Sequence, residues 1–95
     1  MDYRKTKYYR KMTSYRAVGL AEGFEEPSSK LPEEQQKEIL SAWQWLVDRG
    51  QVWSLQGWFG RTASDLLKSG TIKYPKKKTY DYYGNRIPTQ KEMRK

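Results

Sequence analysis

Tryptophan and phenylalanine are confined to the middle of this 95-residue chain, which limits the size and position of any hydrophobic core. All four tryptophans and both phenylalanines lie between residues 24 and 59, whereas all eight tyrosines lie outside that stretch, among basic residues. Only 36% of the residues are hydrophobic. A chain of this length buries roughly two-thirds of the surface that its unfolded form exposes. The sequence therefore predicts one small, central core with two polar ends.

Composition divides the chain into four parts. Residues 1–22 form a basic, tyrosine-rich arm, and residues 23–31 form an acidic linker of turn-forming residues without periodicity. Residues 32–72 form a helical core, and residues 73–95 form a second basic, tyrosine-rich arm. The predicted fold is mainly α. It has a two-helix hairpin or helix-turn-helix core, basic and partly extended N- and C-terminal arms, and a short C-terminal β-hairpin.

The first core helix is expected from Pro32 to the glycine at position 50. Pro32 suits a first helical turn, the two glutamates that follow it complement the helix dipole, and Gly50 provides a C-terminal stop. At 100° per residue, one face is apolar, and it contains Gln36, Ile39, Leu40, Trp43, Leu46 and Val47. The opposite face contains Glu34, Lys37, Glu38, Ser41 and Asp48.

The second core helix is expected to be capped by Ser54 and to end at Gly70. The connection at residues 50–53 is short, so the two helices are expected to be neighbours. The apolar stripe of the second helix contains Leu55, Phe59, Ala63, Leu66 and Leu67. Further on, residues 79–83 and 86–87 flank Gly84-Asn85, which predicts a hairpin with a type II′ turn.

The chain lacks the usual catalytic and metal-binding side chains. It contains no cysteine and no histidine, so it has neither thiolate nor imidazole for nucleophilic catalysis, general base catalysis or metal ligation. It also contains no run of 18 apolar residues. We therefore expect a non-enzyme without catalytic residues, metal, cofactor or small-molecule substrate, and without a membrane association.

Positive charge is concentrated at the two ends. The net charge is +8, and residues 1–16 and 73–95 together hold fourteen basic and three acidic residues. Cations interleaved with aromatic rings are typical of single-stranded nucleic-acid binding, because cations contact phosphates and rings stack on bases. An acidic protein surface, or solubility alone, explains the same composition. The candidate nucleic-acid contacts are Lys5, Lys7, Tyr8, Tyr9, Arg10, Lys11, Arg61, Lys68, Lys76, Lys77, Lys78, Tyr80 and Tyr82.

Two glycines inside the second helix form a strip with little side chain. Gly57, Gly60 and Ser64 share one side of the helix, flanked by Arg61 and Lys68. Because a helical glycine costs about 1 kcal/mol relative to alanine, the strip predicts a close approach. The approaching group is either another segment of this chain or a ligand backbone, as in the Gly-x-x-Gly loop of KH domains. Sequence-specific DNA readout by Gln56 and the polar residues of this helix is a further alternative.

Two tryptophans are candidate protein-interface residues. Trp45 projects onto the polar side of the first helix, where an exposed indole would anchor a partner or be covered by an arm. Trp58 lies at the edge of the second apolar stripe. With Gly57 and Gly60, they define a second hypothesis, in which the protein inhibits a host or defence complex or is a minor virion component.

The segment at residues 42–70 resembles a group of small uncharacterised proteins of tailed bacteriophages, in which the pattern AWQ…LV…G…W.LQG.FGR.A..L…G recurs. The resemblance implies a viral origin and a place in the bacterial host cytoplasm or the virion, but it implies no chemistry. The leading hypothesis is a small, basic, non-catalytic phage accessory protein. It binds nucleic acid, or a larger nucleic-acid-containing complex, through its aromatic arms.

Overall fold

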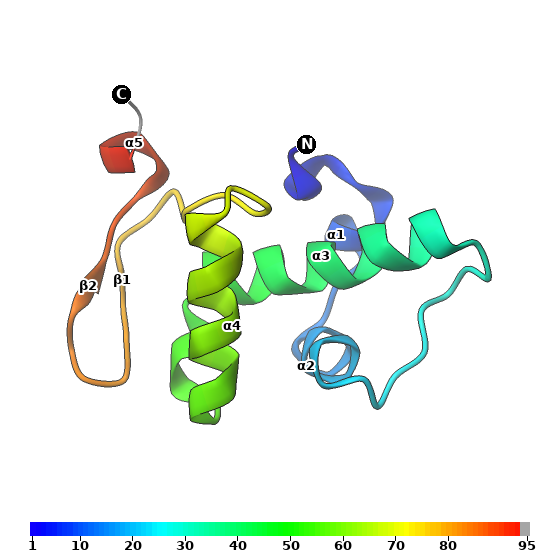
Figure 1. Ribbon diagram of the computed structural model, residues 1–95, viewed down its shortest axis with the longest axis horizontal. Helices are drawn as coiled ribbons and strands as arrows, with labels where there is room; N and C mark the ends of the chain where they lie inside the picture. Colours follow the sequence, from blue (N-terminus) through cyan, green and yellow to red (C-terminus); the bar gives the residue numbers. More distant parts are fainter. Residues whose placement is uncertain (94–95) are drawn as a thin grey trace. The chain divides into compact units, whose positions relative to one another are not determined.

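The computed structural model describes residues 1–93 and is mainly helical, with one small antiparallel sheet near the C-terminus (Figure 1). This confirms the predicted fold class at that level. The chain forms two compact units, of which the first covers residues 1–46 and the second begins at residue 47. Within residues 1–93, no helix combines the length and apolarity needed to cross a bilayer.

The N-terminal arm is helical, and the prediction that it is partly extended was wrong. Side chains of Asp2, Thr6 and Thr13 each accept a hydrogen bond from a backbone N–H of the following turn and thereby cap three successive helices. Ala17 and Leu20 are buried, so the last of these helices has an apolar side. The helices are η1 (Tyr3–Lys5), α1 (Lys7–Arg10) and α2 (Ser14–Glu22).

The acidic linker contains no helix or strand, yet it is held by specific bonds in the first unit. Helix α2 ends at Gly23, whose φ of 87° is left-handed, and the N–H groups of Phe24 and Glu25 donate back to the carbonyl of Gly19. The Glu25 carboxylate then pairs with Arg16 at 2.9 Å. The first residues of the linker thus fold back onto α2, and the rest of it runs as a loop to the start of α3 (Figure 1).

Helix α3 (Pro32–Asp48) begins and ends where its sequence predicts, with Gly50 in the left-handed region after it (φ 72°). Its buried surface is wider than predicted, because every residue from 40 to 47 is buried. Glu38 and Ser41, placed on the polar face by periodicity, are also buried. Ser41 is buried against the N-terminal arm, where Thr6 Oγ1 and Ser41 Oγ share a buried hydrogen bond of 2.7 Å. Glu38 contacts Arg16 of α2 and Ser28 of the linker.

After the last residues of α3, the second unit contains a 3₁₀-helix, η2 (Gln51–Ser54), followed by helix α4 (Gly57–Lys68). Ser54 does not cap α4 as predicted, because its hydroxyl donates to the carbonyl of Gln51 within η2. Leu55 is extended, and Gln56 is the N-cap residue. The core of this unit contains the predicted stripe residues Phe59, Ala63 and Leu67, together with Val52, Trp53 and Ile72.

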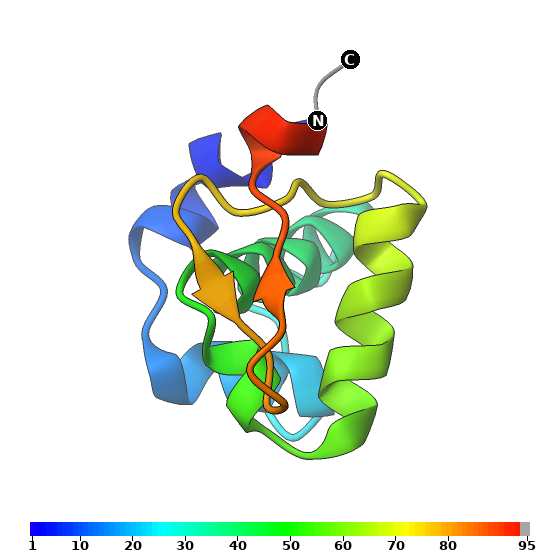
Figure 2. The same ribbon diagram turned by 90° about the vertical axis from the view of Figure 1, so that its left-hand side faces the viewer.

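The predicted C-terminal hairpin is present, but its turn differs. Strands β1 (Thr79–Tyr80) and β2 (Arg86–Ile87) pair antiparallel, and the hairpin lies beside α4 (Figure 2). The first strand ends at Tyr80 rather than at residue 83, so five residues form the turn in place of the expected two. The short helix α5 (Gln90–Met93) follows, and its first N–H donates to the Pro75 carbonyl at 2.7 Å.

Candidate nucleic-acid interface

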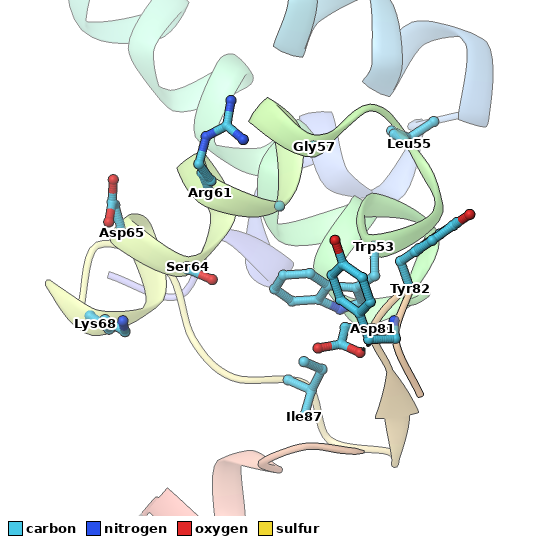
Figure 3. A pocket seen from close by; sticks show the side chains of 12 residues that line it. Trp53, Leu55, Gly57, Arg61, Ser64, Asp65, Lys68, Asp81, Tyr82 and Ile87 are labelled. Atoms are coloured by element: carbon cyan, nitrogen blue, oxygen red, sulfur yellow. Dashed lines mark hydrogen bonds between the residues drawn. The ribbon is translucent and has the colours of Figure 1, made fainter. Parts of the chain in front are cut away.

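A groove of about 770 Å³ lies in the second unit, between α4 and the hairpin (Figure 3). One part of the lining is formed by Trp53 of η2 and by Leu55, which directly follows η2. The hairpin wall contains Asp81, Tyr82, Tyr83 and Ile87. The α4 wall contains Gly57, Gly60, Arg61, Ser64, Asp65 and Lys68.

The glycine strip of α4 faces this groove, and within residues 1–93 no other backbone segment fills it. A Cβ added at Gly60 would meet only the Trp53 ring, at 3.6 Å from Cε3, which is an ordinary contact. A Cβ added at Gly57 would meet only the Arg61 guanidinium, at 3.2 Å. No packing constraint therefore requires glycine at position 60, whereas its missing side chain leaves the groove open.

The hairpin wall displays two adjacent tyrosine rings. Tyr82 and Tyr83 are 78% and 85% exposed, and their rings meet edge to face with centroids 5.4 Å apart. Asp81 organises the turn that carries them, since its Oδ1 accepts from the N–H groups of Tyr83 (2.9 Å) and Asn85 (2.8 Å). Gly84, with φ of 83°, completes the turn. The rings are thus held outward by a hydrogen-bonded tip.

The α4 wall supplies two exposed cations, Arg61 and Lys68. Within residues 1–93, neither has an ion-pair partner. The groove also contains two carboxylates, of which Asp65 is exposed and Asp81 belongs to the turn. The polarity of the groove is therefore mixed, with cations and a carboxylate on one wall and aromatic rings on the other.

The structure brings together five of the predicted site residues, which are Gly57, Gly60, Arg61, Lys68 and Tyr82. Lys76, Lys77, Lys78 and Tyr80 are exposed in the same unit but do not line the groove. Sequence reasoning missed Trp53 and Tyr83 as lining residues. The signal for Tyr83 was present in the Asp-Tyr-Tyr-Gly-Asn segment, because an aspartate ahead of Gly-Asn favours a turn closed by its side chain.

The predicted contacts of the N-terminal arm lie in the first unit and are partly engaged there. The Tyr8 hydroxyl donates a hydrogen bond of 2.7 Å to the Glu34 carboxylate, and this hydrogen bond is the main reason that the pKa of Tyr8 is raised to about 12. Lys37 pairs with the same carboxylate at 3.1 Å. Exposed cations remain at Lys5, Lys7, Arg10 and Lys11, while Tyr9 is half-buried.

The net charge is distributed unevenly between the two units. Residues 1–46 contain eight basic and seven acidic residues, whereas residues 47–95 contain eleven basic and four acidic residues. Arg16 illustrates the difference: its guanidinium contacts both Glu25 (2.9 Å) and Glu38 (3.0 Å) within the first unit. Almost all of the positive excess therefore belongs to the second unit.

The candidate protein-interface tryptophans are not both available. Trp45 is only 7% exposed, so the prediction that it is an exposed anchor was wrong. It belongs to the part of α3 in which every side chain is buried, which periodicity of a single helix does not reveal. Trp58 is half-buried and stacks on Phe59, with ring centroids 3.9 Å apart.

Within the part of the chain that the structure describes, no three carboxylates lie close enough together to hold a metal ion. The elements around the groove define a small, mainly helical domain with a C-terminal β-hairpin. Residues 30–82 match a family described as a domain of unknown function (DUF7417), and the chain belongs to that family. Neither a curated protein nor a solved structure is detectably similar to it.

Proposed function

We propose that this protein is a non-catalytic module that binds nucleic acid, or a complex containing it, chiefly through its second unit. The observation that supports the proposal most directly is the combination of exposed cations and exposed tyrosine rings in that unit. Lys76, Lys77 and Lys78 are all exposed just before the hairpin that displays Tyr82 and Tyr83. Cations that contact phosphates and rings that stack on bases form the usual combination for this ligand.

The distribution of charge supports the same unit. Each lysine or arginine that contacts a phosphate releases condensed counterions, which makes binding favourable and dependent on salt. Cations already paired with carboxylates contribute little to this effect. The basic residues of the first unit are nearly matched in number by acidic ones, so we expect them to have a smaller role.

An acidic protein surface would attract the same lysines, so binding to an acidic protein is the competing function. Such a partner gives no particular reason for two adjacent exposed phenol rings on a rigid turn. On the resemblance of residues 42–70, we further propose that the protein is a phage accessory component, acting in the bacterial cytoplasm or the virion. This origin is compatible with either partner.

The test is a salt titration of binding to labelled oligonucleotides of mixed sequence, followed by fluorescence anisotropy. The informative variant replaces Lys76, Lys77 and Lys78 with glutamine, and the matched control replaces Lys5, Lys7 and Lys11 in the same way. If all three C-terminal lysines contact phosphates, the slope of log affinity against log salt should fall by about 2 for single strands. The control should change the slope by less than half of that amount.

Two results would contradict the proposal. The absence of salt-dependent binding to any oligonucleotide would remove the nucleic-acid function and leave an acidic protein as the partner. Equal losses in the two triple variants would show that net charge, rather than the second unit, determines binding.

A further inference from the structure

The groove has two walls of different chemistry, and this difference limits what can occupy it. Arg61 and Lys68 lie on the α4 wall, but Asp65 lies between them in sequence on the same helix. Asp81 contributes a second carboxylate from the hairpin. A run of phosphates along the whole groove would meet these two carboxylates and be repelled. An anionic chain therefore fits best with its phosphates close to Arg61 and Lys68.

The interior suits a flat, partly apolar group. Trp53, Leu55 and Ile87 line it, and Gly60 contributes no side chain, so the Trp53 ring is covered on that side by a bare stretch of helix. The Asp65 carboxylate next to such a surface is a suitable acceptor for the amino group of a nucleobase. The groove thus combines an aromatic and aliphatic lining with acceptors for base edges.

The hairpin tip provides stacking surfaces at the edge of the groove. Tyr82 and Tyr83 line it while remaining largely exposed, and Figure 3 shows Tyr82 projecting from the hairpin wall. Because Asp81 fixes the turn through its hydrogen bonds, little conformational entropy is lost when a ligand stacks on the rings. Such preorganisation is useful for a ligand whose flat faces are free.

A duplex does not present free base faces, since its bases are stacked on one another. The groove volume of about 770 Å³ also lies in the range of sites for small organic groups, roughly 300–1,000 Å³. A base that has left its stack matches both properties, whereas a double helix matches neither.

We infer that the groove receives a single-stranded segment of nucleic acid, with bases stacked on Tyr82 and Tyr83 and phosphates held by Arg61 and Lys68. This inference rests on the proposed nucleic-acid function and names its substrate class. Asp81 acts as a positioning residue, because it holds the turn and not the ligand.

The first experiment compares single-stranded, double-stranded and abasic single-stranded oligonucleotides of equal length, by anisotropy at fixed salt. The variant replaces Tyr82 and Tyr83 with alanine, and the matched control replaces Tyr15, which is 80% exposed in the first unit, with alanine. Loss of one stacked base corresponds to about 1–3 kcal/mol. We therefore expect single-strand affinity to fall at least fivefold in the double variant and to stay unchanged in the control.

The same double variant should leave duplex and abasic-strand affinities within about twofold of wild type, and the salt slope unchanged, because the phosphate contacts remain. Replacement of both tyrosines by phenylalanine should restore single-strand affinity, since the ring provides the stacking. Loss of salt-dependent binding to every probe would refute the proposed function itself. Retained salt dependence with no effect of the ring variants would refute only the inference.

A second variant tests the interior of the groove without weakening the fold. Gly60→Gln places a flexible side chain where only the Trp53 ring lies nearby, and glutamine favours the helix over glycine. Single-strand affinity should fall at least fivefold while the unfolding midpoint stays the same or rises. Unchanged affinity in this variant, or tighter binding of duplex than of single strand by the wild type, would overturn the inference.

Discussion

Replacement of Glu38 tests the account of the first unit most directly, because this buried carboxylate joins three parts of the sequence. Its side chain is 5% exposed. It accepts hydrogen bonds from Arg16 of α2 at 3.0 Å, and from the N–H and hydroxyl of Ser28 in the linker at 2.6 and 3.1 Å. In Glu38→Ala all three are lost at once.

The size of the stability loss in Glu38→Ala depends on which of the separated groups can be solvated by water. Breaking a fully buried ion pair costs about 3–5 kcal/mol. The Arg16 side chain is 27% exposed and keeps Glu25 as a partner, and the Ser28 hydroxyl is exposed as well. Two costs remain, namely the Ser28 N–H that is left without an acceptor and the loss of the charge pair. We therefore expect Glu38→Ala to lower the free energy of unfolding by about 2 kcal/mol.

The assay is urea unfolding followed by far-ultraviolet circular dichroism. With a slope of about 1–1.5 kcal/mol per molar urea for a chain of this size, the midpoint should fall by between about 1 and 2 M. Glu33→Ala is the matched control, because Glu33 is an exposed glutamate on the same helix, and it should cost less than about 1 kcal/mol. A double-mutant cycle with Arg16→Met isolates the pair. A Glu38→Ala effect below about 0.5 kcal/mol, or no coupling in the cycle, would mean that the Glu38 carboxylate does not hold α2 and the linker to α3.

Three other outcomes are expected from local geometry. Gly19→Ala should lower the free energy of unfolding by about 1–2 kcal/mol, because the added methyl group would overlap the Glu25 side chain and the gain in helix propensity is too small to offset that clash. Unchanged or higher stability in urea would be inconsistent with that packing. Gly60→Ala should instead raise stability by up to about 1 kcal/mol in the same assay, and a decrease would mean that the site is not open. The pKa of Tyr8, raised to about 12 by its bond to Glu34, means that the neutral phenol is favoured in the folded state. This stabilisation should be present below pH 10 and lost as pH rises towards 12, and ultraviolet titration of the wild type against Tyr8→Phe should show one late-titrating tyrosine.

The helices of the middle were predictable from the sequence because their signals are local. Pro32 and Gly50 mark the ends of α3, and the stripe through Phe59, Ala63 and Leu67 identifies α4. The N-cap of α4 is Gln56, two residues after the predicted Ser54, because the hydroxyl of Ser54 donates to a carbonyl of the preceding 3₁₀-helix instead. Element boundaries depend on which of several nearby groups a side chain bonds to, which residue type alone does not resolve.

The helical N-terminal arm was not predictable, because contacts with distant residues hold it. Helix α1 has only four residues, too few for a periodic pattern, and Thr6 bonds to Ser41 across 35 positions of sequence. The bond to Thr6 also explains why periodicity misplaced Ser41 on an exposed face.

The candidate site was predictable in its charges and not in its shape. Arg61 and Lys68 were recognised beside the glycine strip, but the facing wall comes from a turn further along the chain. Its Tyr83 became a groove residue only because Asp81 ends the first strand early.

Hydrogen bonds and an ion pair hold the hairpin at both its tip and its base, which affects how the hairpin opens. Two-residue strands are too short to persist alone, yet Asp81 ties the tip, while the Gln90 N–H to Pro75 bond and the bidentate Arg86–Glu92 pair tie the base. Such a closed segment is expected to open cooperatively. Amide protons of Asn85 and Gln90 should therefore exchange with deuterium at a common rate, and any ligand held by the tyrosine pair must slow both.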